Sequence, residues 1–126
     1  MLAGNFDGDH GSWSVAIWAS EELRLVVYSL LPARASAAAR PDVEALLSRI
    51  NHGLLLGNFE LNDEDGSVRY KTSIGVVGVT ISDALVRELV YPNVATVDRY
   101  LAAVTAVSSG GATLDDGLSM AAAAAG

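Results

Sequence analysis

The stretch GNFELNDEDGSVRYKTSI, residues 57–74, places a dense acidic run between two segments of alternating polar and apolar residues. If residues 63–66 form a four-residue loop, residues 55–62 and 67–75 become two strands that fold back on each other. The cross-strand pairs in that register are Phe59–Tyr70, Glu60–Arg69 and Leu61–Val68. Aromatic pairs and pairs of opposite charge stabilise neighbouring antiparallel strands, and an early Asp with a late Gly is typical of a type I turn. The stretch therefore predicts a β-hairpin.

A calcium loop is the alternative use of the same acidic residues. An EF-hand loop needs oxygen ligands at alternate positions, a Gly at the sixth and a Glu at the twelfth. With Gly66 at the sixth position, the first falls on Leu61, which cannot ligate. The other acidic stretch, NFDGDHG at residues 5–11, has His10 where the Gly belongs and Ala16 where the Glu belongs. Both stretches are expected to be solvated turns, and no metal site is predicted.

Two further strands are predicted nearer the N-terminus. Residues 12–20, SWSVAIWAS, alternate with a period of two, which is typical of a half-buried strand. Residues 23–31, LRLVVYSLL, are predicted as a second strand that Pro32 ends. The short polar break Glu21-Glu22 between them favours a hairpin.

Helical patterns fill most of the remaining chain. Pro41 suits the first turn of a helix, and apolar residues at helical spacing extend that helix over residues 41–52. A second helix follows the cap at residues 80–82. Pro92 is expected to break it, and a further helical segment then continues to Val107.

The order ββ–α–ββ–α–α predicts an α+β fold, an antiparallel β-sheet with helices packed on one face. A length of 126 residues suits one domain, which we expect over residues 1–112. Residues 113–126 end in AAAAAG and are expected to form a short, Ala-rich, frayed tail with at most one short helix.

Composition bounds the classes of function. The formal net charge is −7, and the basic residues form no cluster, so no nucleic-acid partner is expected. The absence of Cys removes disulfides and thiolate chemistry and fits a cytoplasmic protein. The N-terminal residues lack the basic and apolar regions of a signal peptide, and no apolar stretch is long enough to span a bilayer. No membrane partner is expected.

Candidate catalytic residues are few. His10 and His52 are the only histidines, and His52 lies near a predicted helix C-terminus, where an imidazolium is favoured by the helix dipole. Nucleophile and cofactor motifs such as Gly-x-Ser-x-Gly or a phosphate-binding Gly-rich loop are absent from the sequence. Adjacent carboxylates occur as Glu21-Glu22 and Asp115-Asp116, where desolvation is not expected. The sequence therefore predicts no catalytic residue, no cofactor and no enzyme.

Several short motifs occur in one order within residues 4–110. They are Asn51 with Gly57-Asn58-Phe59-Glu60-Leu61, then Asp65-Gly66, Arg69-Tyr70, Lys71-Thr72-Ser73, and Asn93 with Asp98-Arg99-Tyr100, together with VVYSLLP at 26–32. In this order they resemble the YbjN family. The resemblance implies the fold of type III secretion chaperones of the Tir-chaperone kind and a role as a regulator of sensory transduction. Family members usually begin with a helix and a strand before the segment that resembles residues 4–13, so the N-terminal helix is expected to be missing here.

Strand 23–31 is apolar on both of its faces, which implies that both are covered. The helices at 41–52 and 94–107 can cover one face. Self-association through a two-fold interface is the simplest cover for the other. The residues predicted at this interface are Trp18, Val26, Tyr28 and Leu30.

The sequence supports two hypotheses of function. The first is a non-enzymatic protein-interaction module, chaperone-like or regulatory, whose partners are a second copy in a homodimer and an unidentified protein. The alternative is a small-ligand sensor, with a pocket between helices and sheet lined by Phe59, Tyr70 and Leu101.

Overall fold

The computed structural model describes residues 1–20 and 23–125 of the chain. The strands are β1 (Leu2–Asp7), β2 (Ser12–Ala19), β3 (Arg24–Arg34), β4 (Asn58–Leu61) and β5 (Ser67–Gly75). The helices are α1 (Arg40–His52), α2 (Asp83–Ser108) and α3 (Leu114–Ala125). The predicted break at Glu21-Glu22 lies outside the described residues.

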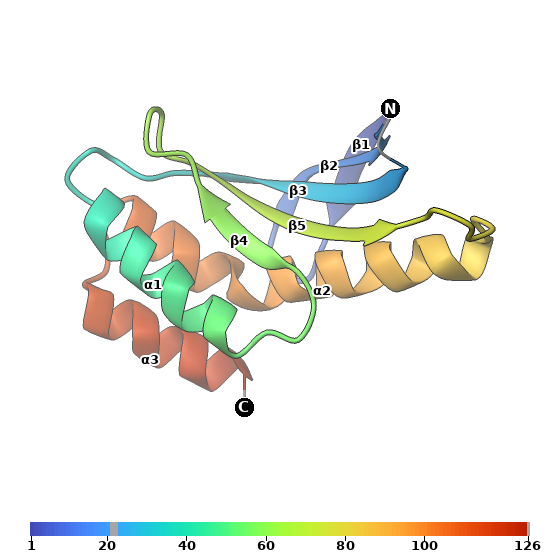
Figure 1. Ribbon diagram of the computed structural model, residues 1–126. Helices are drawn as coiled ribbons and strands as arrows, with labels where there is room; N and C mark the ends of the chain where they lie inside the picture. The colour runs from blue at the N-terminus through green and yellow to red at the C-terminus, as the bar shows by residue number, and fades with distance from the viewer. Residues whose placement is uncertain (21–22, 126) are drawn as a thin grey trace.

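All five strands form one antiparallel sheet in the order β1-β2-β3-β5-β4, and the helices lie on one side of it (Figure 1). This is the predicted α+β architecture. The long helix α2 runs along the underside of the sheet, while α1 and α3 lie beside the C-terminal half of α2 (Figure 1). The other side of the sheet carries no described helix.

The hairpin predicted from residues 57–74 is confirmed in its register. Phe59 pairs with Tyr70, Glu60 with Arg69, and Leu61 with Val68. The loop closes through a hydrogen bond from the N–H of Asn62 to the carbonyl of Ser67, 2.8 Å long. Alternation along β4 and β5 directs Phe59 and Tyr70 towards the helices, where both are buried. Their ring centroids lie 4.7 Å apart.

The core lies between the sheet and the helices. β3 contributes its inward residues Leu25, Val27 and Leu31, and α1 contributes the buried stripe predicted from its spacing. The stripe on α1 comprises Val43, Leu46, Leu47 and Ile50. Apolar side chains at every third or fourth position of a helix share one face, which explains why this stripe meets the sheet.

The N-terminal acidic stretch, residues 5–11, is divided between a strand and a turn. Residues 2–7 form β1, and the turn is confined to residues 8–11, where the N–H of Gly8 donates to the carbonyl of Gly11 at 2.7 Å. Pro32 does not end β3 either, since the strand continues to Arg34 with a register shift after Leu30. A strand can hold a proline at such an irregularity, because a ladder hydrogen bond is already missing there.

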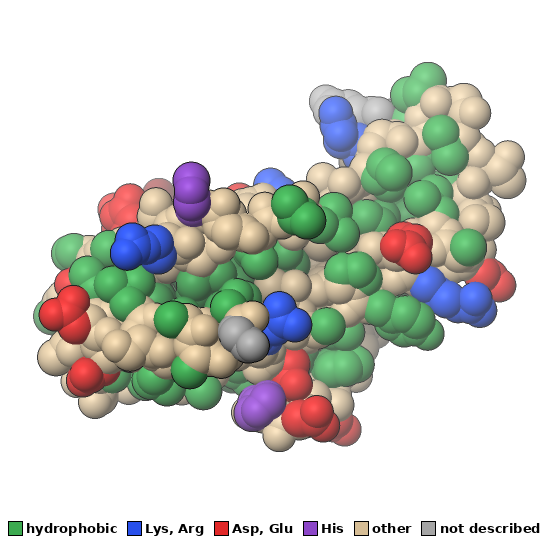
Figure 2. All heavy atoms as spheres, turned by 90° about the horizontal axis from the view of Figure 1, so that it is seen from below, with side chains coloured by type: hydrophobic (Ala, Val, Ile, Leu, Met, Phe, Trp, Pro, Cys, Tyr) green, Lys and Arg blue, Asp and Glu red, His purple; other side chains and the backbone are tan. Residues whose placement is uncertain are grey.

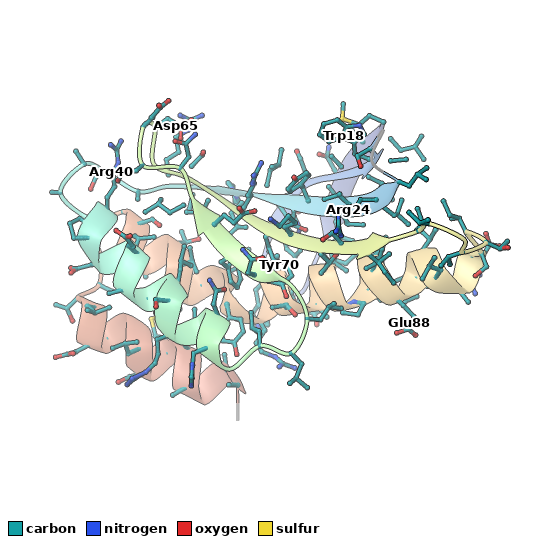
Figure 3. All side chains as sticks on the ribbon, viewed as in Figure 1. Trp18, Arg24, Arg40, Asp65, Tyr70 and Glu88 are labelled. Atoms are coloured by element: carbon teal, nitrogen blue, oxygen red, sulfur yellow. The ribbon has the colours of Figure 1, made fainter. Side chains whose placement is uncertain are left out.

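α2 is continuous across Pro92, where a break was expected. A proline in a helix removes the hydrogen bond to the carbonyl four residues earlier, here that of Glu88. Figure 3 shows Glu88 pointing away from the sheet, so that this loss falls on the solvent side. The next residue, Asn93, is fully buried and bonds to the sheet. Packing on the sheet therefore overrides the local cost of the proline.

The Ala-rich C-terminal segment was expected to be a frayed tail, but here too packing produces a helix. Residues 114–125 form the helix α3, which packs on α1 and α2, and Gly117 and Ala121 are buried in the contact. A Cβ on Gly117 would collide with Val107 of α2. Small residues thus allow the two helices to approach closely, and the segment is part of the fold instead of a frayed end.

Candidate protein-binding face

The helix-free side of the sheet carries the residues predicted as an interface. The register pairs Trp18 with Val26 across β2 and β3. Because side chains alternate along a strand, Tyr28 and Leu30 follow Val26 on the same side. Figure 3 shows Trp18 above the sheet, whereas Tyr70 lies below it, towards the helices. The structure therefore brings all four predicted residues together, and we call the surface formed by Trp18, Val26, Tyr28 and Leu30 the open face.

The open face is partly exposed to solvent. Trp18 is 50% exposed and Leu30 46%, while Tyr28 is half-buried and Val26 only 8% exposed. Ala16 lies opposite Tyr28 on β2 and adds a small apolar side chain. These side chains make the surface over β2 and β3 largely apolar.

Charged residues border this surface on β4 and β5. The guanidinium of Arg69 lies 4.4 Å from the centre of the Tyr28 ring, within the range of a cation–π contact. Its Nε lies 3.2 Å from Glu60 Oε1, and Lys71 Nζ lies 3.4 Å from the same oxygen. The open face is thus apolar on one half and bordered by a small network of opposite charges on the other.

A buried polar cluster beneath the sheet was missed by sequence reasoning. Asn93 of α2 donates to the carbonyl of Val27 at 3.0 Å and to Thr72 Oγ1 at 3.1 Å, and it accepts from Ser29 Oγ at 2.5 Å. Trp13 Nε1 donates to Ser29 Oγ at 3.0 Å, and Thr72 donates to the carbonyl of Leu89. Each of these groups has a partner, so the cluster fixes α2 under β3 and β5. Its one signal in the sequence is an Asn on an apolar helix stripe.

Asp98 of α2 holds the turn between β1 and β2. Its Oδ1 accepts from the N–H of His10 at 2.9 Å, and its Oδ2 lies 3.2 Å from His10 Nδ1. Burial raises the pKa of Asp98, but hydrogen bonds from His10 and from the backbone of Asp9 outweigh it and hold this pKa below its ordinary value. A Cβ on Gly8 would collide with the carboxylate. The other histidine, His52, lies in the last turn of α1, as predicted.

The acidic run at residues 62–66 is a turn built by its own side chains. Asn62 Oδ1 accepts from the N–H of Glu64 at 2.9 Å, and Asp65 Oδ1 accepts from both the N–H and the hydroxyl of Ser67. These bonds to Ser67 lower the pKa of Asp65. Figure 3 shows Asp65 at the tip of the hairpin, with Arg40 nearby. Arg40 donates to the carbonyl of Asp63 at 2.9 Å, which ties the turn to α1.

Asn51 occupies the outer edge of β4. Its Oδ1 accepts from the N–H of Phe59 at 2.8 Å, and its Nδ2 donates to the carbonyl of Phe59 at 3.0 Å. The amide therefore bonds to β4 in the way that a neighbouring strand would. Gly57, just before β4, has φ +74°, and a Cβ there would collide with the carbonyl of Lys71. Asn51 and Gly57, both residues of the family-like motifs, therefore hold β4 in place.

The predicted ligand pocket is filled by the core. Phe59, Tyr70 and Leu101 are all buried, and the ring of Tyr100 lies 6.2 Å from that of Phe59 at its edge. Burial raises the pKa of Tyr70, whose hydroxyl donates to the carbonyl of Leu56. Of the three residues, Phe59 alone lines a described hollow, an open one of about 360 Å³ between α1 and β4.

The described residues hold no group of three or more His, Asp or Glu that could bind a metal ion. Within the same residues, every helix is too short or too polar to cross a bilayer. Figure 2, seen from the helix side, shows hydrophobic side chains interspersed with single acidic and basic groups on that face.

Fold and site together define a small α+β domain with one uncovered sheet face. The model of the YbjN family, described as "Putative bacterial sensory transduction regulator", matches residues 3–106. The chain belongs to this family. Comparison with curated proteins gave no match, and comparison with solved structures gave none either.

Proposed function

We propose that the chain is a non-enzymatic regulatory module that works as a homodimer in the cytoplasm and binds a segment of another protein on its open face. The observation that carries the proposal is the exposure of Trp18 and Leu30 on a sheet face without a described helix. Large contiguous apolar patches are rare on soluble monomers and mark sites of protein interaction. The net charge of −7 keeps such a surface in solution.

Polar residues of the family-like motifs have structural partners, which supports a role without catalysis. Asp98 binds the turn at His10, Asp65 binds Ser67, and Asn93 joins α2 to β3. These contacts give the three motif residues a role in holding the fold. The description of the family supports a regulatory role.

Protein capture on matched variants tests the open face. Immobilised wild-type chain, Tyr28→Glu and Tyr91→Glu are exposed to the same extract, and the retained proteins are identified and then assayed in purified form. Tyr91 is 62% exposed on α2, on the opposite side of the sheet, so that its change serves as the control. Wild type and Tyr91→Glu should retain one protein that Tyr28→Glu loses, because a buried carboxylate at the contact is costly.

Circular dichroism of the three chains confirms that each is folded. Equal retention by all three variants would contradict the proposal, and so would the absence of any protein that binds wild type in purified form. For the self-contact, the sequence points to the same four residues of the open face. The edge strand β1 is a second candidate surface for self-association. Sedimentation of variants distinguishes the open face from β1.

A further inference from the structure

β1 is an edge strand without the usual protection. It lies at one end of the sheet and pairs with β2 from Leu2 to Asp7 in one continuous register. Soluble proteins blunt their edge strands with Lys, Pro, bulges or short length. Residues 2–7 contain no Lys or Pro, and their single charge is Asp7 at the end of the strand. In the described chain nothing pairs with the outer side of β1.

The opposite edge of the sheet differs. β4 has four residues, and the N–H and carbonyl of Phe59 are both bonded to the side chain of Asn51. A strand arriving at β4 would have to displace that amide. The sheet therefore has one protected edge and one open edge.

The sequence of β1 is symmetric in side-chain size about Gly4. Large apolar Leu2 and Phe6 lie two residues before and after it, and the small Ala3 and Asn5 lie between. Alternation puts Leu2, Gly4 and Phe6 on the inner side of the sheet, because Phe6 pairs with the buried Trp13. A two-fold interface requires such a pattern, since each residue i must suit its partner j in both directions.

An apolar groove lies beneath the open edge, between β1–β2 and α2. It has a volume of about 210 Å³, and its lining includes Leu2, Phe6, Ile17, Val90 and Val94. Leu2 is 73% exposed at its mouth. A strand added beside β1 would lay its own inner side chains along this groove.

We propose that a second copy of this chain pairs antiparallel with β1 about Gly4, which joins two five-stranded sheets into one. Leu2 then lies opposite Phe6 of the second copy, and Gly4 lies opposite Gly4. In this register inner side chains meet inner ones, so the helices of both copies lie on one side and the open faces on the other. Asp7 of each copy lies at the opposite end of the contact from the other Asp7, so these charges do not face each other.

This inference rests on the proposed function only for the statement that the chain is a homodimer. It assigns the self-contact to the edge and leaves the two open faces side by side for a partner protein. The contact is one strand wide, which places it at the small end of protein interfaces. We therefore expect the equilibrium between monomer and dimer to be measurable at protein concentrations up to about 100 µM.

Sedimentation equilibrium of charge variants at position 4 tests the register. A Cβ at Gly4 has nothing within 4 Å, and its φ is not positive, so that neither Gly4→Lys nor Gly4→Glu meets a backbone clash in the fold. Each variant alone places like charges across the two-fold axis and should weaken the dimer about tenfold or more. An equimolar mixture of the two should restore the dimer, because opposite charges then meet. Tyr28→Glu should remain a dimer.

A wild-type monomer at the highest concentration would overturn the proposal, as would a Gly4→Lys dimer as tight as wild type. If Tyr28→Glu dissociates the dimer while Gly4→Lys does not, the second copy lies on the open face. That result would overturn the edge pairing and leave the homodimer of the proposed function standing, while the capture experiment tests the binding of a partner protein separately. Circular dichroism of each variant shows whether it is folded. Ala3→Lys serves as a control for the position of the charge, because mixing it with Gly4→Glu should not restore the dimer.

Discussion

At the scale of single residues, Gly66 shows how one position fixes a turn. Its φ is +77°, and a Cβ there would collide with the carbonyl of Ala35. The N–H of Ala35 also donates to the carbonyl of Gly66 at 2.8 Å, so the two segments cannot move apart without losing that bond. The turn joins the end of β3 to the β4–β5 hairpin.

Gly66→Ala should lower the free energy of unfolding by about 1–3 kcal/mol or more, because a left-handed backbone is strained in any residue with a Cβ. The control is Asp63→Asn with Glu64→Gln, since the turn uses the backbone groups of both residues. That double change should alter the free energy of unfolding by no more than about 0.5 kcal/mol. Urea unfolding measures both. A larger loss in the control than in Gly66→Ala would contradict the structural role assigned to this turn.

The lowered pKa of Asp98 predicts that the stability of the fold depends on pH. Because its pKa is lowered in the folded chain, the carboxylate stabilises the fold above its unfolded pKa of about 3.9, and that stabilisation is lost as the pH falls through the lower folded value. The stability gap between wild type and Asp98→Asn should therefore be full at pH 5 and close below about pH 4. Unfolding curves across this range measure the gap.

His10→Ala keeps the backbone bond to Asp98 and should retain part of the gap, whereas Asp9→Asn, which changes only an exposed side chain, should leave it whole. A gap that widens below pH 4 would show that the carboxylate does not carry the effect. The sequence could not predict this contact, because the two residues are 88 positions apart. The same holds for Asn93 and Val27, whose pairing depends on how α2 lies under the sheet.

At the scale of elements, strong local patterns predicted the structure well. The β4–β5 register followed from alternation and turn chemistry, and α1 followed from its apolar spacing. β1 was missed because Gly4, Asn5 and Asp7 have low strand propensity, and the strand forms because β2 offers it an edge. The four residues of the open face were chosen because an uninterrupted apolar run implies burial on both sides of a strand, and their use as an interface stays a prediction.

α3 provides a test in which two effects oppose each other. Gly117→Ala gains about 1 kcal/mol in helix propensity, but its Cβ would collide with Val107 of α2, and overpacking costs about 1–3 kcal/mol. We expect a net loss in thermal stability, whereas Ser119→Ala, which is exposed on the same helix, should be neutral or slightly stabilising. A gain for Gly117→Ala in differential scanning calorimetry would show that α3 does not pack closely on α2.

At the scale of the whole molecule, charge opposes self-association. A dimer carries a formal charge of −14, twice the −7 of one chain. The Debye length shortens from about 30 Å at 0.01 M salt to about 8 Å at 0.15 M. The dissociation constant of the dimer should therefore fall as sodium chloride rises over this range, because the apolar strand contact is unaffected while repulsion is screened. Weaker association at high salt would indicate that opposite charges hold the copies together.

The unequal edges of the sheet also set the size of any assembly. A sheet with two open edges can add copies without end, which is the geometry of a fibril. Here Asn51 occupies the edge at β4, so pairing at β1 uses the only open edge of each chain in the described structure and growth stops at two. The side-chain amide of Asn51 thus acts as a chain terminator. Its replacement by Ala would turn a closed pair into a unit of polymerisation.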